Sequence, residues 1–261
     1  MNETKRLWIF LGAVIFSTLF VLGWFGRELY RKVPPIPLEV RVETGERLMT
    51  KDDILNGQQA WQSIGGQQVG SIWGHGAYQA PDWSADWLHR EAVALRNMLS
   101  TTYHSGRYDD LSEIAQAEID QRVRSQMRRN TYNPDTGVLT ISRERASAIE
   151  TTADHYIVLF GDDPKLSDLR ESYALHEAAL PDMSRRKAIT AFFFWTAWAS
   201  TTERPNMSVT YTNNWPHEPM VGNQATTASL VWSLFSIALL LAGVGGLVWY
   251  KLFRDQDEDP P

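Results

Sequence analysis

The stretch "IGGQQVGSIWGHGAY" (Ile64 to Tyr78) combines small residues with closely spaced glycines and ends in an aromatic residue. Glycines in such a stretch allow tight turns and a close approach of the backbone to a bound group. Yet the stretch contains no cysteine, and its one histidine, His75, follows the position where a ligand is expected. It therefore has the form of a cofactor-binding loop without the residues that would hold the cofactor.

The overall composition limits the chemistry of the chain. It has 261 residues, no cysteine, 11 tryptophans and a formal net charge of −6. The lack of cysteine excludes disulfides, thiolate metal sites and covalent attachment of a c-type haem. The mild acidity gives no reason to expect a nucleic-acid partner.

Two uncharged apolar runs, Leu7 to Gly26 and Ala228 to Tyr250, lie near the two ends of the chain. At about 1.5 Å per helical residue, each is long enough to cross the hydrocarbon core of a bilayer. The first run is a retained anchor rather than a cleaved signal peptide, because no small-residue cleavage site follows it. The sequence therefore predicts two membrane helices.

Basic residues predict the orientation of these helices. Lys251 and Arg254 follow the second run, whereas no Lys or Arg closely precedes it. The positive-inside rule puts that end in the cytoplasm, and an even number of spans returns the N-terminus to the same side. In the inner membrane we expect a cytoplasmic N-terminus (1–6), a first span (7–26), a periplasmic or exterior domain (27–226), a second span (227–250) and a cytoplasmic linker (251–261).

The outer domain is predicted to be mainly helical, with one minor hairpin around "NPDTGVLTI". Its entry "RKVPPIPLEV" is proline-rich and extended. Thr50 is expected to cap a helix that stops at Gly65, and Ser84 to cap the next helix. A further helix carries one apolar stripe, formed by Leu111, Ile114, Ile119, Val123 and Met127. Two more helices are expected, in "SRERASAIETTADHYIVLFG" and in "SRRKAITAFFFWTAWAS". The uncharged part of the second, Ala188 to Thr202, is too short to span a membrane. That helix is therefore a core helix or lies on the membrane surface.

The segment "GGQQVGSIWGHGAYQAPDW" (Gly65 to Trp83) resembles the haem loop of the cytochrome-c-bearing small subunit of nitric oxide reductase. That family pattern is C-x-x-C-H, a short T-I-L-like run, then G-E-G-A-Y and A-P-D. Gly66 and Val69 stand at its two cysteine positions, and Gly70 stands at its histidine position. The tail of the pattern is retained as Gly74, Gly76, Ala77, Tyr78, Ala80, Pro81 and Asp82.

This combination resembles the N-terminal part of the quinol-dependent nitric oxide reductases, and "TYTNNWPHEP" (Thr210 to Pro219) fits the same family. In that family a haem-free cytochrome-c-like domain with inserted helices precedes the catalytic membrane subunit. The resemblance implies a structural and docking role in an enzyme that reduces nitric oxide to nitrous oxide with electrons from quinol. Haem b, haem b3 and non-haem iron would belong to the catalytic partner or downstream region.

No catalytic residue is assigned to this chain, and alone it is expected to be inactive. The catalytic metals of the family are held by histidines within membrane helices, whereas neither apolar run contains His, Glu or Asp. A lost haem would also leave a void of a few hundred Å³, which at about 24 cal/mol per Å³ costs on the order of 10 kcal/mol. Aromatic side chains are expected to fill that space, unless they are simply core: Trp61, Trp73, Phe192, Phe193, Phe194, Trp195 and Trp198.

The retained tail suggests a calcium site by resemblance. In the two-subunit relatives, the glycine backbone and the tyrosine of G-A-Y help to hold a calcium ion where the outer domain meets the catalytic subunit. Gly76 and Tyr78 occupy those positions here, and oxygen ligands suit this cation. His75 stands where the family has Glu. The alternative is that Gly74 and Gly76 only permit a tight turn and that Tyr78 packs.

Three other groups have both a functional and a structural interpretation. In the functional interpretation, His155 forms a metal or proton site with Asp154 and Glu150; in the structural one, it is a packed or solvated histidine. In the functional interpretation, the pair His217–Glu218 relays protons or contacts a quinol head group. In the structural one, it is a solvated pair beside the membrane. Small residues in the second run form a face for helix docking, or reflect the usual glycine content of membrane helices: Ala242, Gly243 and Gly246.

Two other classes of function compete with the reductase. A two-span sensor or ligand-binding domain would carry a signalling domain behind the second span, where 11 residues follow Tyr250. A stand-alone membrane scaffold protein would have no electron-transfer partner. Co-purification with a b-haem protein would distinguish the reductase module from both alternatives.

Overall fold

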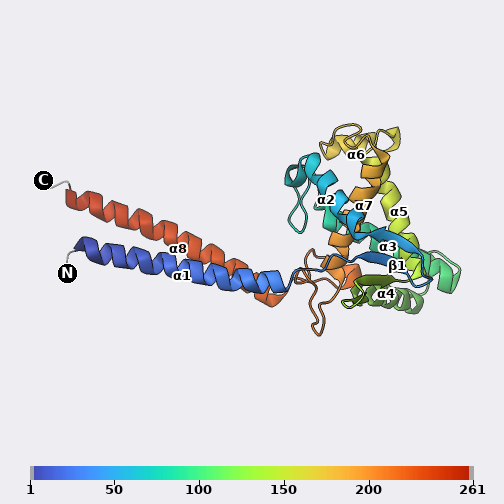
Figure 1. Cartoon of the computed structure of the whole chain (residues 1–261), viewed down its shortest axis with the longest axis horizontal. Coiled ribbons are helices and arrows are strands. Elements are labelled where there is room, and N and C mark those ends of the chain that lie inside the picture. Colours follow the sequence, from blue (N-terminus) through green and yellow to red (C-terminus); the bar gives the residue numbers. More distant parts are fainter. Residues whose placement is uncertain (1–2, 259–261) are drawn as a thin grey trace. The chain divides into compact units, whose positions relative to one another are not determined.

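The computed structural model describes residues 3–258, so parts of the predicted cytoplasmic segments 1–6 and 251–261 lie outside the described residues. The chain divides into two units, Met1–Ile36 and Pro37–Pro261, which are considered separately. The first unit contains the helix α1 (Glu3–Arg31) and the proline-rich stretch that follows it. The second contains a globular part and the C-terminal helix α8 (Thr227–Glu258) (Figure 1).

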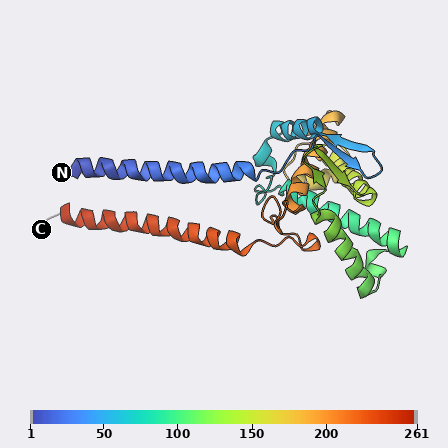
Figure 2. The ribbon, with the colours of Figure 1, turned by 60° about the horizontal axis from the view of Figure 1, so that its bottom comes forward.

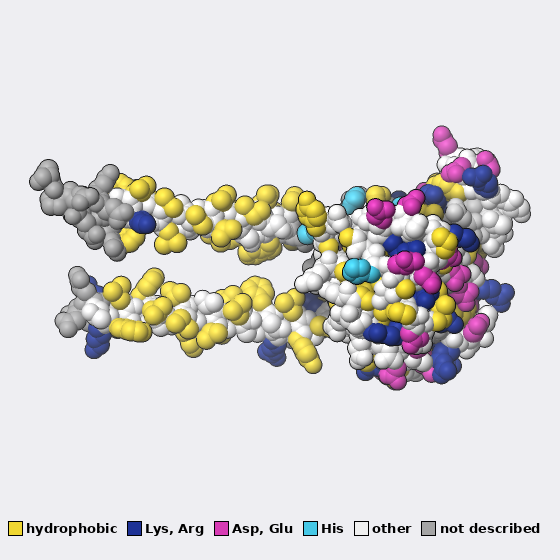
Figure 3. All heavy atoms as spheres, turned by 90° about the horizontal axis from the view of Figure 1, so that it is seen from above, with side chains coloured by type: hydrophobic (Ala, Val, Ile, Leu, Met, Phe, Trp, Pro, Cys, Tyr) yellow, Lys and Arg dark blue, Asp and Glu magenta, His cyan; other side chains and the backbone are white. Residues whose placement is uncertain are grey.

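Both terminal helices are long and apolar enough to cross a membrane. The apolar parts run from Thr4 to Tyr30 in α1 and from Thr227 to Phe253 in α8, and neither is buried within the protein. Apolar side chains cover both helices along their length (Figure 3). An unburied apolar surface of this length is typical of a helix that crosses a membrane. The prediction of two candidate membrane helices, one on each side of the domain, is confirmed.

A small four-stranded sheet forms one side of the globular part. Its strands are β1 (Glu39–Val42), β2 (Arg47–Thr50), β3 (Tyr132–Asn133) and β4 (Val138–Ile141), in the order β2-β1-β4-β3. The hairpin β3–β4 was expected, but the sequence analysis missed β1 and β2. Strand β1 pairs in parallel with β4, almost a hundred residues later, and this long-range pairing leaves no local signal beyond two alternating valines, Val40 and Val42.

The helices are close to those expected, with one corrected cap. Helix α2 (Lys51–Ser63) begins at the predicted cap Thr50, which forms a capping box with Asp53. Helix α3 (Trp83–His104) is capped by Asp82, so the predicted cap at Ser84 is wrong; Ser84 lies inside the helix. The remaining elements are α4 (Glu113–Arg128), α5 (Arg143–Leu159), α6 (Ser167–Ser172), α7 (Met183–Thr201) and the short 3-10 turns η1 (Gly66–Val69), η2 (Tyr108–Asp110), η3 (Pro164–Leu166) and η4 (Pro219–Val221).

The predicted stripe on α4 is only partly buried. Ile119, Val123 and Met127 are buried, but Ile114 is 85% exposed and Leu111 precedes the helix. The first turn of α4 extends beyond the body of the domain, so the side chain of Ile114 is exposed to solvent. A pattern of spacing identifies a helix face, but it does not show where the supporting core ends.

Helix α7 forms the centre of the domain and packs against α2, α3 and α5 (Figure 2). All residues from Ile189 to Thr201 are buried, so α7 is a core helix rather than a helix on the membrane surface. Its contact with α2 is close because of Gly57, where a Cβ would lie 2.1 Å from the carbonyl oxygen of Ala188. The main core of the globular domain is therefore helix on helix, with the small sheet at its edge.

Candidate site in the loop between α2 and α3

The loop of residues 65–82 lies against the aromatic side of α7. The Trp61 indole donates to the carbonyl of Gly70 over 3.3 Å and its rings lie 5.7 Å from Phe192. The Trp73 indole donates to the carbonyl of Thr196 over 2.9 Å and packs on Trp195. The expected proximity of this loop to the helix Ala188–Ser200 is confirmed.

The first part of the loop contains the three positions that match the haem-binding pattern. Gly66 and Val69 lie in the 3-10 turn η1, and Gly70 follows it with φ of 121°. A Cβ at Gly70 would lie 2.1 Å from the indole nitrogen of Trp83 and 2.8 Å from the carbonyl oxygen of Pro81. The space beside Gly70 is thus taken by Trp83, and a side chain at position 70 would collide with it.

Trp83 is fully buried in an aromatic cluster that the sequence analysis missed. It stacks on Phe193 with a centroid distance of 5.5 Å and an interplanar angle of 11°. Its indole also donates to the carbonyl of Val69 over 3.0 Å, which ties the loop to the cluster. The other rings around it belong to Tyr156, Phe160 and Tyr173. Its position directly after the A-P-D motif, as the first residue of α3, was the available signal.

The predicted filling side chains belong to the same core. Six of the seven are buried, namely Trp61, Phe192, Phe193, Phe194, Trp195 and Trp198, while Trp73 is half-buried. Tyr156, at the back of the cluster, donates its hydroxyl to Asp86 over 2.6 Å. Burial, with the nearby Asp86 carboxylate, raises the pKa of Tyr156 well above its ordinary value. The phenol therefore stays neutral and acts as a buried donor.

The second part of the loop is organised by Asp82. Its Oδ2 accepts hydrogen bonds from the Ser71 hydroxyl at 2.7 Å and from the Gly74 amide at 2.6 Å, and its Oδ1 caps α3 through the Ala85 amide at 2.9 Å. The Ser71 hydroxyl in turn accepts from the Gly76 amide at 2.7 Å. Asp82 is buried, so these bonds form away from water. They explain why the A-P-D motif accompanies the glycines.

The end of the loop carries the two residues of the predicted calcium site. Gly76 has φ of 87°, which favours glycine, and the Ala77 amide donates to the carbonyl of Ala80 across a tight turn. Tyr78, at this turn, is fully exposed, so the alternative in which Tyr78 packs on the domain is wrong. Among the residues that the structure describes, no group of three or more His, Asp or Glu could hold a metal.

His155 lies apart from this loop, against the ring of Tyr156 at a centroid distance of 5.2 Å. Burial lowers its pKa, with a smaller contribution from Arg90. Its Nε2 is buried and has no hydrogen-bond partner among the described residues. The packed-histidine interpretation therefore describes its surroundings better than a site shared with Asp154 and Glu150.

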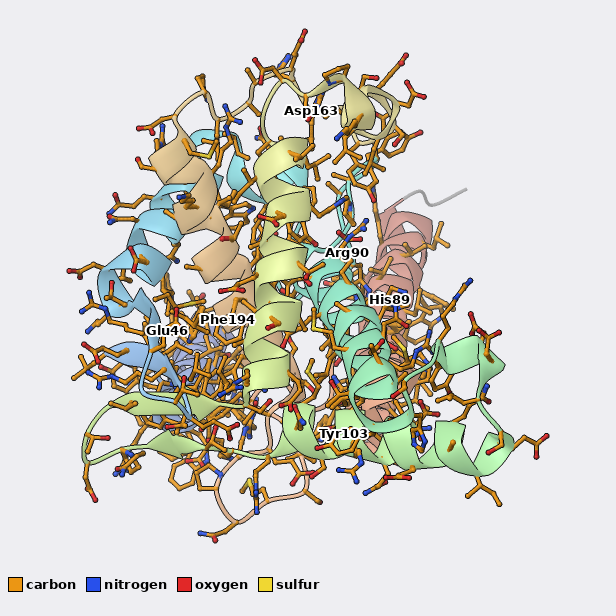
Figure 4. All side chains as sticks on the ribbon, turned by 90° about the vertical axis from the view of Figure 1, so that its right-hand side faces the viewer. Glu46, His89, Arg90, Tyr103, Asp163 and Phe194 are labelled. Atoms are coloured by element: carbon orange, nitrogen blue, oxygen red, sulfur yellow. The ribbon has the colours of Figure 1, made fainter. Side chains whose placement is uncertain are left out.

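The pair His217–Glu218 does not act as a unit. Glu218 is buried, and its carboxylate lies 2.9 Å from Nδ1 of His89. His89 belongs to α3 (Figure 4). His217 is exposed. His89 could not be found from the sequence, because a contact between residues 129 positions apart leaves no local pattern. The Glu218–His89 contact holds the segment before α8 onto the globular domain.

These features define a mainly helical domain with a small sheet and a candidate membrane helix at each end of the chain. A comparison with protein-family models matches residues 37–217 to the cytochrome c-like domain of the nitric oxide reductase NorB. This match covers more than half of the chain, so the chain belongs to that family and is related to nitric oxide reductase. A comparison with curated proteins gives no match.

Proposed function

We propose that this chain is the N-terminal module of a quinol-dependent nitric oxide reductase. That enzyme combines two molecules of nitric oxide with two electrons and two protons to give nitrous oxide and water. The family match over residues 37–217 supports the relation to the reductase. The single observation that carries the more specific proposal is the loop that keeps the family turn but replaces its haem-binding residues with Gly66, Val69 and Gly70.

The residues of the loop do not fit a c-type haem. No cysteine is available for a thioether bond, and Trp83 occupies the space into which a side chain at Gly70 would extend. Electrons would then pass from quinol to the haem groups of the catalytic partner without crossing this domain. The role of the domain is structural: it covers the outer face of the catalytic part, in the periplasm or cell exterior, and excludes water there.

A calcium ion at the turn of Gly76 and Tyr78 would stabilise the contact with the catalytic part. The exposed phenol of Tyr78 and the backbone oxygen of Gly76 are hard oxygen donors, as calcium prefers. An ion with six to eight ligands needs further donors, which the partner would supply. Such a shared ion would form only when the two parts meet.

Purification from native membranes tests the function. We expect the chain, solubilised with its membrane neighbours, to co-purify with b-type haem and nitric oxide reductase activity supported by quinol. Expressed alone, it should have no Soret absorbance. A c-type spectrum of the isolated chain would contradict the haem-free assignment, and purification without any haem protein would favour the scaffold or sensor alternatives.

A tyrosine variant tests the calcium contact. Tyr78→Phe should weaken the association with the haem-bearing part, and a calcium chelator should weaken the wild-type complex but add little to the variant. Tyr103→Phe, on the half-exposed Tyr103 of α3, is the matched control and should behave as wild type. Equal sensitivity of both variants to the chelator would rule out calcium binding by Tyr78.

A further inference from the structure

A cavity of about 440 Å³ lies where the globular part of the second unit meets the start of α8. Its volume is typical of ligand pockets. One wall consists of the rings of Trp73, His75 and Trp215, and α8 contributes Ser229, Leu230 and Ser233 to the lining. The apolar span of α8 begins at Thr227, so the cavity lies beside the first turns of a candidate membrane helix.

Both tryptophans in this wall are held in place by the domain itself. The Trp73 indole donates to the carbonyl of Thr196 and the Trp215 indole to the carbonyl of Gly74, each over 2.9 Å. Since both N–H groups are used, these residues offer a ligand their ring surfaces. The ring of His75 stands edge-on to Trp215 at 4.7 Å. Aromatic faces carry negative potential and attract ammonium groups, most strongly when water is excluded.

The other residues that line the cavity determine which net charge a bound ligand can carry. Among the residues that line it, none is Lys, Arg, Asp or Glu, so a ligand with a large net charge would find no counterion. His75 and Asn213, both exposed, can donate hydrogen bonds to phosphate oxygens. A ligand that carries an ammonium and a phosphate on one short headgroup can place the ammonium on the aromatic rings and the phosphate at the hydrogen-bond donors.

We propose that this cavity binds the headgroup of a zwitterionic phospholipid. The ammonium lies against Trp73 and Trp215, the phosphate lies at His75 and Asn213, and the acyl chains follow the apolar surface of α8 from Leu230 onward. A lipid is the occupant because one wall of the cavity is the start of a membrane span. This site needs no haem-bearing partner and goes beyond the reductase role.

The test measures which lipids stay bound to the full-length chain after purification. The detergent-solubilised chain is mixed with equal amounts of phosphatidylethanolamine, phosphatidylcholine and phosphatidylglycerol with identical acyl chains, and bound lipid is counted by native mass spectrometry. We expect the two ammonium-bearing lipids to be retained about three- to tenfold more than phosphatidylglycerol, as a cation–π contribution predicts. Soluble phosphocholine should compete poorly, because it lacks the acyl chains.

Two variants connect this preference to the cavity. Trp215→Leu should abolish it, whereas Trp249→Leu, the same change at an exposed residue of α8 outside the cavity, should preserve it. His75→Ala removes an exposed side chain, is expected to leave the fold intact and should weaken retention of all three lipids. Equal retention of the three lipids by the wild-type chain would overturn the proposal. So would loss of the preference in Trp249→Leu, its persistence in folded Trp215→Leu, or unchanged retention in His75→Ala.

Discussion

The loop between α2 and α3 has two halves that acquire their shapes in different ways. In residues 65–70 three positions are glycine, and the space beside Gly66 and Gly70 is occupied by Trp61 and Trp83 from outside the loop. In residues 71–82 the shape comes from hydrogen bonds within the loop, which converge on Asp82 and Ser71. The first half depends on packing, and the second half on buried polar contacts.

This difference shows what each half can do. Gly66 and Gly70, which stand at two of the haem-binding positions of the family pattern, are buried, and Trp83 fills the space beside Gly70. A segment held by its own hydrogen bonds can present an exposed residue, Tyr78, in a fixed turn. The retained motif therefore lies in the half that turns Tyr78 outward, which we call the outward half.

The largest effect is expected from placing a histidine at position 70, where the family pattern has one. In Gly70→His the new Cβ would lie 2.1 Å from the indole nitrogen of Trp83, and the backbone has φ of 121°, which L-residues rarely adopt. We expect the free energy of unfolding to fall by more than about 4 kcal/mol, or folded protein not to accumulate. Urea unfolding of the purified chain, followed by near-UV circular dichroism, measures the loss.

The control for this change is Gly45→His. Gly45 also has a positive φ, of 94°, but a Cβ there meets nothing within 4 Å. It should cost only the backbone strain, on the order of 1–2 kcal/mol. Equal losses in the two variants would mean that Trp83 does not fill the space beside Gly70.

The second-largest effect is expected at the centre of the outward half. Asp82→Ala removes the cap of α3 and leaves the Gly74 amide and the Ser71 hydroxyl without their acceptor. A lost cap and unsatisfied buried donors together cost about 2–4 kcal/mol. Asp182→Ala removes an exposed cap at the start of α7 and should cost about 1 kcal/mol in the same unfolding measurement. A smaller loss at Asp82 than at Asp182 would show that the loop does not depend on this carboxylate.

The sequence predicted the candidate site better where the signal was local. The glycines, the A-P-D motif and the aromatic helix are contiguous patterns, so their proximity could be inferred from the family resemblance. Trp83 was missed because it was one of 11 tryptophans, and its burial depends on Tyr156 of α5 and Phe193 of α7. The ring that fills the space beside Gly70 could not be chosen without the tertiary contacts.

In the fold, too, elements with local sequence signals were predicted and those that depend on distant contacts were not. Helices α5 and α7 were expected because capping residues and apolar runs are local signals. Strand β1 was missed because its partner β4 is distant in the sequence and its four residues follow a proline-rich segment. The cap of α3 was misplaced by two residues, since Asp82 and Ser84 are both good caps and only the loop geometry distinguishes them.

A third prediction separates the two hydrogen bonds of the Ser71 hydroxyl from the effect of Asp82. Ser71→Ala leaves the Gly76 amide without its acceptor but keeps the cap of α3. We expect a loss of about 1–2 kcal/mol in the free energy of unfolding, because Ser71 is buried. Ser172→Ala, which removes an exposed hydroxyl bonded to the carbonyl of Leu169, should change stability by less than about 0.5 kcal/mol. Indistinguishable variants would mean that the outward half tolerates the loss of its internal bonds.

The smallest effect is expected at the exposed turn itself. Tyr78 is fully exposed, so Tyr78→Ala should leave the free energy of unfolding within about 0.5 kcal/mol of wild type. A fall of about 1 kcal/mol or more would show that the ring packs on the domain and that the outward half also depends on packing. If stability is unchanged, any weakening of the complex by a change at Tyr78 must arise from a lost contact with the partner. The comparison between the two halves then reduces to one measurable contrast: changes at Gly70 affect folding, and changes at Tyr78 affect only association.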